Sequence, residues 1–232
     1  MNKIFIDTKN YNLNIQNDLV YEIHIQNDTD ITISVLENVS SKINLFIKNS
    51  HVKITINNLE NSDLIVNQLA INSSISLNIN LNLCSKIRYN NSILTNVDSI
   101  NEITINHLES NSSSMVIANG INLSDNKFFF IIDGIINKNS LNVVLDEKSK
   151  IINIGDGNSK IIPNLIVNNQ DVVANHSAFI GKFTEEEINY LKSRGISDET
   201  AKKLLLTSLL LGNMVDTSYL EFRNFIDNNI II

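Results

Sequence analysis

Apolar residues recur at every second position over most of the chain, from residue 4 to about residue 167. The clearest case spans residues 75–83, where Ile or Leu alternates with Asn or Ser without interruption. Strict alternation places one row of side chains on a buried face and the other row towards solvent. This run, and shorter ones such as 31–35 and 43–47, predict a succession of half-buried β-strands.

Short polar segments interrupt the alternating runs and predict turns. They are rich in Asn, Asp and Ser, whose side chains hydrogen-bond to the nearby backbone, and they fall at 27–30, 48–51, 72–74 and 111–114. With 7 Gly and 1 Pro in 232 residues, the chain lacks the glycine-rich turns of hairpin barrels and sandwiches. We therefore predict the stacked coils of a β-solenoid, with a β-sandwich as the alternative.

The pattern changes after Gly181 and predicts helices. Thr184 and Glu187 have the spacing of a capping box, so a first helix is expected to run to Arg194 and to end at a left-handed Gly195. Ser197 is expected to cap a second helix that ends before Gly212. These features predict a β-helix core at 1–180 and a helical C-terminal subdomain at 181–232.

The helical segments also carry apolar faces. In the second helix we expect the buried face to consist of Ala201, Leu204, Leu205, Ser208 and Leu209 or Leu211. A third amphipathic segment, Tyr219–Ile226, predicts another helix, whereas residues 228–232 are compatible with a return to a strand.

Composition narrows the classes of function. The net charge is −7 and the 18 basic residues form no dense run, which argues against nucleic-acid binding because phosphate neutralisation requires clustered Lys and Arg. The N-terminus lacks the apolar segment of a secretory signal, and no stretch approaches the roughly 20 apolar residues of a membrane span. These features predict a cytoplasmic protein that does not associate with membranes.

Residues with catalytic or metal-binding chemistry are few and scattered. Cys84 is the single cysteine, which leaves either a small buried side chain or an outward-facing thiol. We expect His24, His51 and His107 at solvated strand or turn positions. The sequence contains no Gly-x-Ser-x-Gly motif, and the glycines at 154–160 and 181–182 do not match a Walker A loop. We therefore predict that the chain is not an enzyme.

A function of a different class also fits a β-helix. In a carbohydrate-active enzyme or an adhesin-like binding module, paired carboxylates can line a groove and act on a polysaccharide. Asp146, Glu147 and Asp156 are the candidate carboxylates for this alternative.

Four segments of the last third of the chain carry a family resemblance. They read Ile-Asn-Ile-Gly-Asp (152–156), Ile-Pro-Asn-Leu (162–165), Asp-Val-Val-Ala-Asn-His-Ser-Ala (171–178) and Phe-Thr-Glu-Glu-Glu-Ile-Asn-Tyr-Leu-Lys-Ser-Arg-Gly-Ile (183–196). The loop, the histidine, the capping box and the paired helices follow the order found in the SufB/SufD family of iron-sulfur cluster assembly scaffolds, which this region resembles. In the first 150 residues only the alternating pattern is similar.

The resemblance implies a fold and a set of partners. The fold is a mainly β, right-handed parallel β-helix with a small helical C-terminus. The partners are a SufB-like protomer or a second copy, bound through the C-terminal strands, and a SufC-like ABC ATPase, bound by the helices. No cofactor is expected to stay bound to the isolated chain, while a transient iron-sulfur cluster at a subunit interface is compatible with the family. The candidate ATPase-docking residues are Glu186, Tyr190, Arg194 and Gly195.

Within the family, the chain resembles SufD more than SufB. SufB carries a sulfur-accepting cysteine, and the matching place here is Lys148 or Ser149, neither of which can hold a persulfide. His176 is followed by Ser177, as in SufD-like proteins, where SufB has Glu. The resemblance makes His176 the candidate interface residue for cluster assembly, with an imidazole able to bind iron. The family's N-terminal helical region has no counterpart before the strands, so we expect a shortened SufD-like protein.

Overall fold

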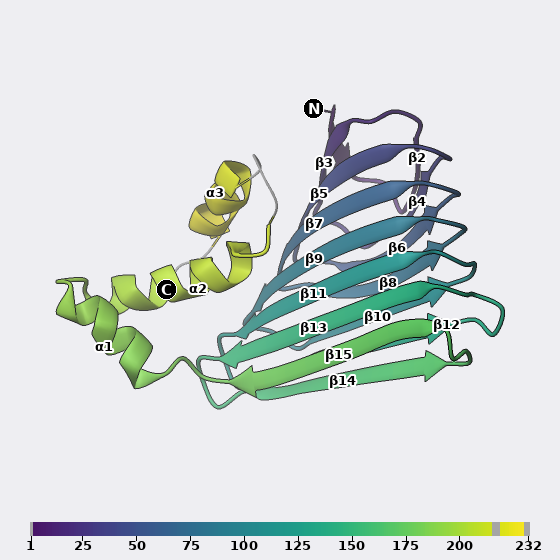
Figure 1. Ribbon diagram of the computed structural model, residues 1–232. Coiled ribbons are helices and arrows are strands. Elements are labelled where there is room, and N and C mark those ends of the chain that lie inside the picture. Colours follow the sequence, from purple (N-terminus) through teal and green to yellow (C-terminus); the bar gives the residue numbers. More distant parts are fainter. Residues whose placement is uncertain (1, 215–218, 230–232) are drawn as a thin grey trace.

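The protein is a β-solenoid, as the alternating pattern predicts. A computed structural model describes residues 2–214 and 219–229, with two β-sheets whose strand pairs are all parallel (Figure 1). Consecutive strands alternate between the two sheets, so the chain winds through one coil after another. The β-sandwich alternative is therefore wrong.

The strands have the following bounds. The eight-stranded sheet contains, in spatial order, β1 (Asn2–Ile6), β3 (Val20–Ile25), β5 (Ser40–Lys48), β7 (Asp63–Ile71), β9 (Lys86–Thr95), β11 (Ser113–Asn122), β13 (Val143–Asn153) and β15 (Val172–Gly181). The seven-stranded sheet contains β2 (Asn10–Ile15), β4 (Thr29–Val35), β6 (His51–Asn58), β8 (Ser74–Leu81), β10 (Ser99–His107), β12 (Lys127–Ile136) and β14 (Asn158–Val167).

The main hydrophobic core lies between the two sheets. Alternate residues of each strand point inward, and the in-register pairing stacks like on like, as in the row Ile31, Ile54, Leu77 and Ile103. All four side chains in this row are buried. Because a fully buried Ile or Leu contributes about 1.5–3 kcal/mol, such rows repeated along the solenoid supply the main stabilisation of the fold.

Asparagine in the left-handed region builds the corners of the coils. At the corner that leads into the eight-stranded sheet, residues with positive φ recur once per coil: Asn38, Asn61, Cys84, Asn111 and Asn142. Asn tolerates this conformation better than other residues with a side chain because its short amide bonds locally. Cys84 takes the same backbone position as the asparagines and is half-buried.

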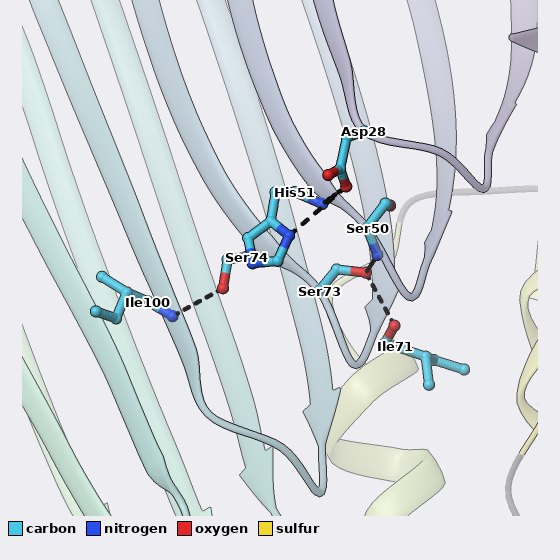
Figure 2. Close-up of polar contacts among 7 residues, drawn as sticks. All are labelled: Asp28, Ser50, His51, Ile71, Ser73, Ser74 and Ile100. Atoms are coloured by element: carbon cyan, nitrogen blue, oxygen red, sulfur yellow. Dashed lines mark hydrogen bonds and ion pairs between the residues drawn. The ribbon is translucent and has the colours of Figure 1, made fainter. Parts of the chain in front are cut away.

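The opposite corner is held by side chains that bond to a neighbouring coil or turn (Figure 2). The Ser50 amide donates to Ser73 Oγ (3.3 Å), and Ser73 Oγ donates to the Ile71 carbonyl (2.9 Å). The His51 amide donates to Asp28 Oδ1 (2.7 Å). The His51 ring is 80% exposed, so the predicted solvated turn position is confirmed for this histidine.

The three predicted helices are present, although the first ends one residue before its expected end and the third extends three residues beyond it. The helices are α1 (Glu185–Ser193), α2 (Asp198–Leu211) and α3 (Tyr219–Asn229). Thr184 Oγ1 accepts from the Glu187 amide (3.2 Å), and Glu187 Oε2 accepts from the Thr184 amide (2.8 Å), which completes the capping box. Gly195 has φ of +82°. Residues 228–229 belong to α3 rather than to a strand, and 230–232 lie outside the described residues.

Helices α2 and α3 cover the outer face of the eight-stranded sheet (Figure 1). A second apolar cluster joins Phe46, Leu69, Leu94 and other sheet residues to the helices. Two sheet side chains also bond to the end of α2: Ser92 Oγ donates to the Leu210 carbonyl (2.5 Å) and Asn119 Nδ2 donates to the Leu209 carbonyl (3.0 Å). These contacts fix how α2 lies on the strands.

The predicted buried face of α2 is partly wrong. The buried residues are Ala201, Leu206, Thr207, Leu210 and Leu211. Leu204 is 40% exposed and Ser208 is exposed. Leucines occur on nearly every side of this helix, so the sequence period does not select one face, and the bonds to Ser92 and Asn119 select it instead.

Two of the histidines predicted at solvated positions are not solvated. His107 is fully buried, with Nδ1 2.8 Å from Ser112 Oγ and Nε2 2.9 Å from Ser114 Oγ, and burial lowers its pKa to about 4. The His24 ring is sandwiched between the rings of Phe5 and Phe46, at centroid distances of 4.9 and 4.7 Å. In both places neighbouring coils cover the side chain, which a single strand's pattern does not reveal.

Candidate functional site

The last coil of the solenoid leaves two parallel strand edges unpaired within the described residues. Strand β15 ends the eight-stranded sheet and β14 ends the seven-stranded sheet, each with one neighbour only. Apolar side chains on these two strands are exposed: Ile166, Val167, Val173, Phe179 and Ile180, at 38–54%. Unpaired edges with exposed apolar side chains favour pairing with another chain.

A buried carboxylate lies just inside this end of the solenoid. Glu147 on β13 occupies an inward position of the alternating pattern, is 1% exposed, and neither of its side-chain oxygens has a hydrogen-bond partner among the described residues. Burial, together with the negative charges of Asp133 and Asp146, raises the pKa of Glu147 to about 8. Burial of a carboxyl group without a hydrogen-bond partner is unfavourable, so Glu147 lowers the free energy of unfolding.

Gly134 on β12 provides the space for this carboxylate. A Cβ atom placed on Gly134 would lie 2.6 Å from Glu147 Oε1 and 2.7 Å from Leu145 Cδ1. The Glu147 side chain on the eight-stranded sheet therefore extends across the space between the sheets towards Gly134 on the seven-stranded sheet, which has no side chain to block it. Glycine at position 134 and glutamate at position 147 fit each other sterically.

The candidate residue His176 is the neighbour of Glu147 in the sheet. Strands β13 and β15 pair with Glu147 opposite His176, and residues paired in register point to the same side of a parallel sheet, about 4.8 Å apart. His176 is exposed because no further strand follows β15 in the sheet. The end coil therefore presents an imidazole to the exterior with a carboxylate directly behind it.

The two places that match the SufB cysteine have ordinary structural contacts. The Lys148 ammonium is exposed and lies 3.0 Å from Asp146 Oδ2. Ser149 is buried, and its Oγ donates to the Ser177 carbonyl (3.1 Å), which ties β13 to β15. The structure therefore shows both side chains engaged in contacts within the end coil.

The candidate docking residues lie on a helix that projects from the solenoid (Figure 1). None of residues 185–193 is buried, and Glu186 and Arg194 are exposed. Tyr190 is 61% exposed, and the Arg194 guanidinium lies 5.5 Å from its ring centroid. Gly195 then turns the chain from α1 into α2, so these four residues form one accessible surface next to the turn.

The carboxylates proposed for a carbohydrate-active site do not converge. Asp146 and Glu147 are consecutive strand residues, so they point to opposite faces of the sheet. The Asp156 side chain is 91% exposed and pairs with Lys182 (3.0 Å). A groove of about 480 Å³ on the seven-stranded sheet is bordered by Asp28, Asp30 and Glu102 together with Lys9 and Lys53, and so has mixed charge.

Metal-binding side chains are not clustered in the part of the chain that the structure describes. Residues 2–214 and 219–229 contain no group of three or more His, Cys, Asp and Glu residues that could enclose a metal ion. Among the same residues, no helix has the length and apolar character needed to cross a membrane.

The sequence did not predict Glu147 as a residue of the end-coil site. It was a candidate only for the carbohydrate-active alternative. The alternation around it was a usable signal. Val143, Leu145, Ser149 and Ile151 fill the other inward positions of β13, so an acidic residue in this row is an exception to a buried pattern.

The fold and the end coil define a parallel β-solenoid whose last strands are open for pairing and whose helical C-terminus projects beside them. The family model "SUF system FeS cluster assembly, SufBD core domain" matches residues 4–209. The chain therefore belongs to the SufBD family, and the match includes the first 150 residues, where the sequence showed only a similar pattern.

A curated relative agrees with this assignment over a short segment. An iron-sulfur cluster assembly SufBD family protein of Mycobacterium leprae (strain TN) is 41% identical to the chain over 46 residues. The matched segment covers 19% of this chain and 12% of the relative.

Proposed function

We propose that the protein is a SufD-like, non-catalytic scaffold subunit of a cytoplasmic SUF iron-sulfur cluster assembly complex. The observation that carries this proposal is the SufBD core match over residues 4–209, which associates the chain with iron-sulfur cluster assembly. The SufD-like character rests on Lys148 and Ser149 in the place of the SufB cysteine. The iron-sulfur cluster is the cargo of the complex and not a cofactor of this chain.

The end coil is the surface that would pair with a second scaffold protomer. The unpaired edges of β14 and β15 offer backbone hydrogen-bonding groups, and the exposed Val173 and Phe179 offer apolar area. The partner would be a SufB-like protomer or a second copy with the same kind of end coil. Its strands could pair with the free backbone groups and cover the apolar side chains. His176 would then lie at the subunit interface, where the cluster is assembled.

The projecting helix and its turn would bind a SufC-like ABC ATPase. Helix α1 has no buried residue, so it has little role in stabilising the solenoid. Gly195 has φ of +82°, and an added Cβ would meet no atom within 4 Å. Its role is therefore to set the direction of α2 relative to α1 and not to relieve crowding.

Substitutions at the turn test the docking proposal. Gly195→Val places a β-branched residue at positive φ, which costs at least about 1–2 kcal/mol in that conformation, and should re-aim α1 relative to α2. Arg194→Glu reverses an exposed charge. We expect both variants to lose at least about tenfold in affinity for the SufC-like ATPase, a loss of roughly 1.4 kcal/mol, measured by pull-down and calorimetry.

The matched control is Gly195→Asn, since Asn adopts positive φ at several corners of this same fold, as at Asn61 and Asn111. This variant should bind nearly as the wild type does. All variants should keep the wild-type circular dichroism spectrum. Wild-type binding by Gly195→Val and Arg194→Glu would show that the ATPase does not dock at this turn.

A further inference from the structure

The groove on the seven-stranded sheet lies where strands β4, β6, β8 and β10 begin. Two rows of side chains border its volume of about 480 Å³. The first row contains Asp28, His51, Ser74 and Ile100, which follow one another in Figure 2, and the second row contains Asp30, Lys53, Ser76 and Glu102. Each row takes one residue from each strand, so the groove runs along the solenoid axis, across the strands.

The charged side chains of the second row are available to a ligand. Asp30, Lys53 and Glu102 are exposed, as is Lys9, which borders the groove beyond Asp30. None of the ion pairs between described residues includes any of these four side chains. By contrast, Asp28 in the first row is already engaged by the His51 amide at 2.7 Å.

These four charges alternate in sign along the axis. The order is Lys9, Asp30, Lys53 and Glu102, with the uncharged Ser76 between the last two. Because neighbouring strands lie about 4.8 Å apart, the series spans roughly 19 Å over four strand spacings. A ligand that complements it must be elongated and must carry charges of both signs in alternation.

We propose that this groove binds an extended peptide of another protein, in which acidic and basic residues alternate at every second position. Every second side chain of an extended chain points to the same face, at intervals of about 7 Å. Four such side chains span roughly 20 Å, which matches the length of the charge series. A nucleic acid would not fit, since its backbone charges are all negative.

The occupant is not a segment of this chain. A peptide of this kind contains two basic residues four positions apart, and no two of the 18 Lys and Arg residues have that spacing. The groove is also separate from the end coil formed by β14 and β15 and from helix α1. The inference therefore goes beyond the proposed function and does not depend on a SufB-like or SufC-like partner.

Ile100 provides an apolar contact beside the last charge of the series. It is 46% exposed and lies two residues before Glu102 on the same face of β10. A Lys or Arg residue that pairs with Glu102 could place its methylene groups against Ile100. Exposed ion pairs are weak one by one, and this contact adds apolar burial to the network of charges.

Fluorescence anisotropy with a labelled peptide, Glu-Ser-Lys-Ser-Glu-Ser-Lys, tests the proposal on the full chain. We expect saturable binding below about 1 mM that weakens as salt is raised, because salt screens exposed charges. The isomer Glu-Glu-Ser-Ser-Ser-Lys-Lys has the same composition without the alternation and should bind at least about tenfold more weakly. Asp30→Lys and Lys53→Glu should each reduce affinity for the alternating peptide by about tenfold.

Reversal of all four charges provides a gain-of-binding control. In Lys9→Glu/Asp30→Lys/Lys53→Glu/Glu102→Lys the signs alternate again, so the same peptide should bind in the opposite direction with an affinity restored to within about threefold of the wild type. A loss caused by misfolding in the single variants would not be restored in this way. Glu37→Lys and Lys138→Glu, at exposed positions outside the groove, should bind as the wild type does.

Three results would overturn the inference. They are equal affinity for the alternating and block-charged peptides, wild-type affinity in both Asp30→Lys and Lys53→Glu, and binding of a neutral oligosaccharide such as maltopentaose without binding of the peptide. None of them bears on binding of the ATPase at the turn around Gly195, which is measured separately.

Discussion

Replacing Glu147 with Gln is expected to raise the free energy of unfolding of the chain at pH 7 by about 3–4 kcal/mol. The fold raises the pKa of this carboxyl group from 4.5 to about 8, so the native state keeps a proton that the unfolded chain releases. The native state is therefore penalised progressively as pH rises from about 4.5 to 8. At pH 7 the difference spans roughly 2.5 pH units at about 1.4 kcal/mol each, and Gln removes it.

Urea denaturation in the presence of a chelator measures this effect. The gain in free energy of unfolding in Glu147→Gln should be large at pH 7. It should be small at pH 4, where the Glu147 carboxyl group of the wild type is mostly protonated in both the native and the unfolded state. Asp156→Asn is the control, because the Asp156 side chain is 91% exposed and pairs with the exposed Lys182, and surface pairs contribute about 1 kcal/mol or less. A Glu147→Gln variant less stable than the wild type at pH 7 would contradict the account of an unpartnered carboxylate.

Acidification should destabilise the protein through His107. Burial lowers the pKa of this imidazole from 6.5 to about 4, so the unfolded chain takes up a proton that the native state refuses. The contribution of His107 to the free energy of unfolding is fully present above pH 6.5. It is lost as pH falls from 6.5 towards 4, by about 2–3 kcal/mol. Both ring nitrogens contact serine hydroxyls, of Ser112 and Ser114, and not a carboxylate whose negative charge would stabilise the protonated form.

The effect of His107 is best measured in a variant without Glu147. Between pH 4.5 and 6.5, a fall in pH relieves the penalty of the Glu147 carboxylate while it increases the penalty of His107. We expect the two contributions to offset each other in the wild type and the loss due to His107 to emerge in Glu147→Gln. Denaturation curves at pH 6.5 and pH 4 should differ by about 2–3 kcal/mol more in Glu147→Gln than in Glu147→Gln/His107→Asn. Equal pH dependence in the two variants would show that His107 has the same pKa in the native state as in the unfolded chain, which would contradict this prediction.

The regular parts of the fold could be predicted because each local signal agrees with the global structure. Alternation along 75–83 predicts β8, where Ile75, Leu77, Ile79 and Leu81 are buried. The polar breaks predict corners, and Asn49, Asn72 and Asn111 there have positive φ. The capping box at Thr184 likewise depends on residues within four positions of one another. Such features are encoded locally, so one sequence reveals them.

The features that were not predicted depend on contacts between distant coils. His107 is buried because Ser112 and Ser114 of the next strand and its corner enclose it. The face of α2 is selected by Ser92 and Asn119, which are 118 and 90 residues away from their partners. Glu147 meets its neighbour His176 only when the coils are stacked. In a solenoid such contacts depend on the length of each coil, which varies along this chain.

The site residues divide in the same way. The resemblance named His176 and the residues of the helical turn, and the structure places His176 on the open end coil and Tyr190 on a projecting helix. Physical features of the end coil added Glu147, whose lack of a hydrogen-bond partner is visible only in three dimensions. Roles of these residues in docking and in cluster assembly are proposals, and the Gly195 and Arg194 variants test the docking.

Co-expression with a SufB-like protomer and a SufC-like ATPase, followed by affinity purification and native mass spectrometry, tests the central claim most directly. We expect a complex in which this chain, a scaffold partner and the ATPase are retained together, and which loses the ATPase in Arg194→Glu. Recovery of the wild-type chain as a monomer, free of both proteins at micromolar concentration, would contradict its role as a SUF scaffold subunit.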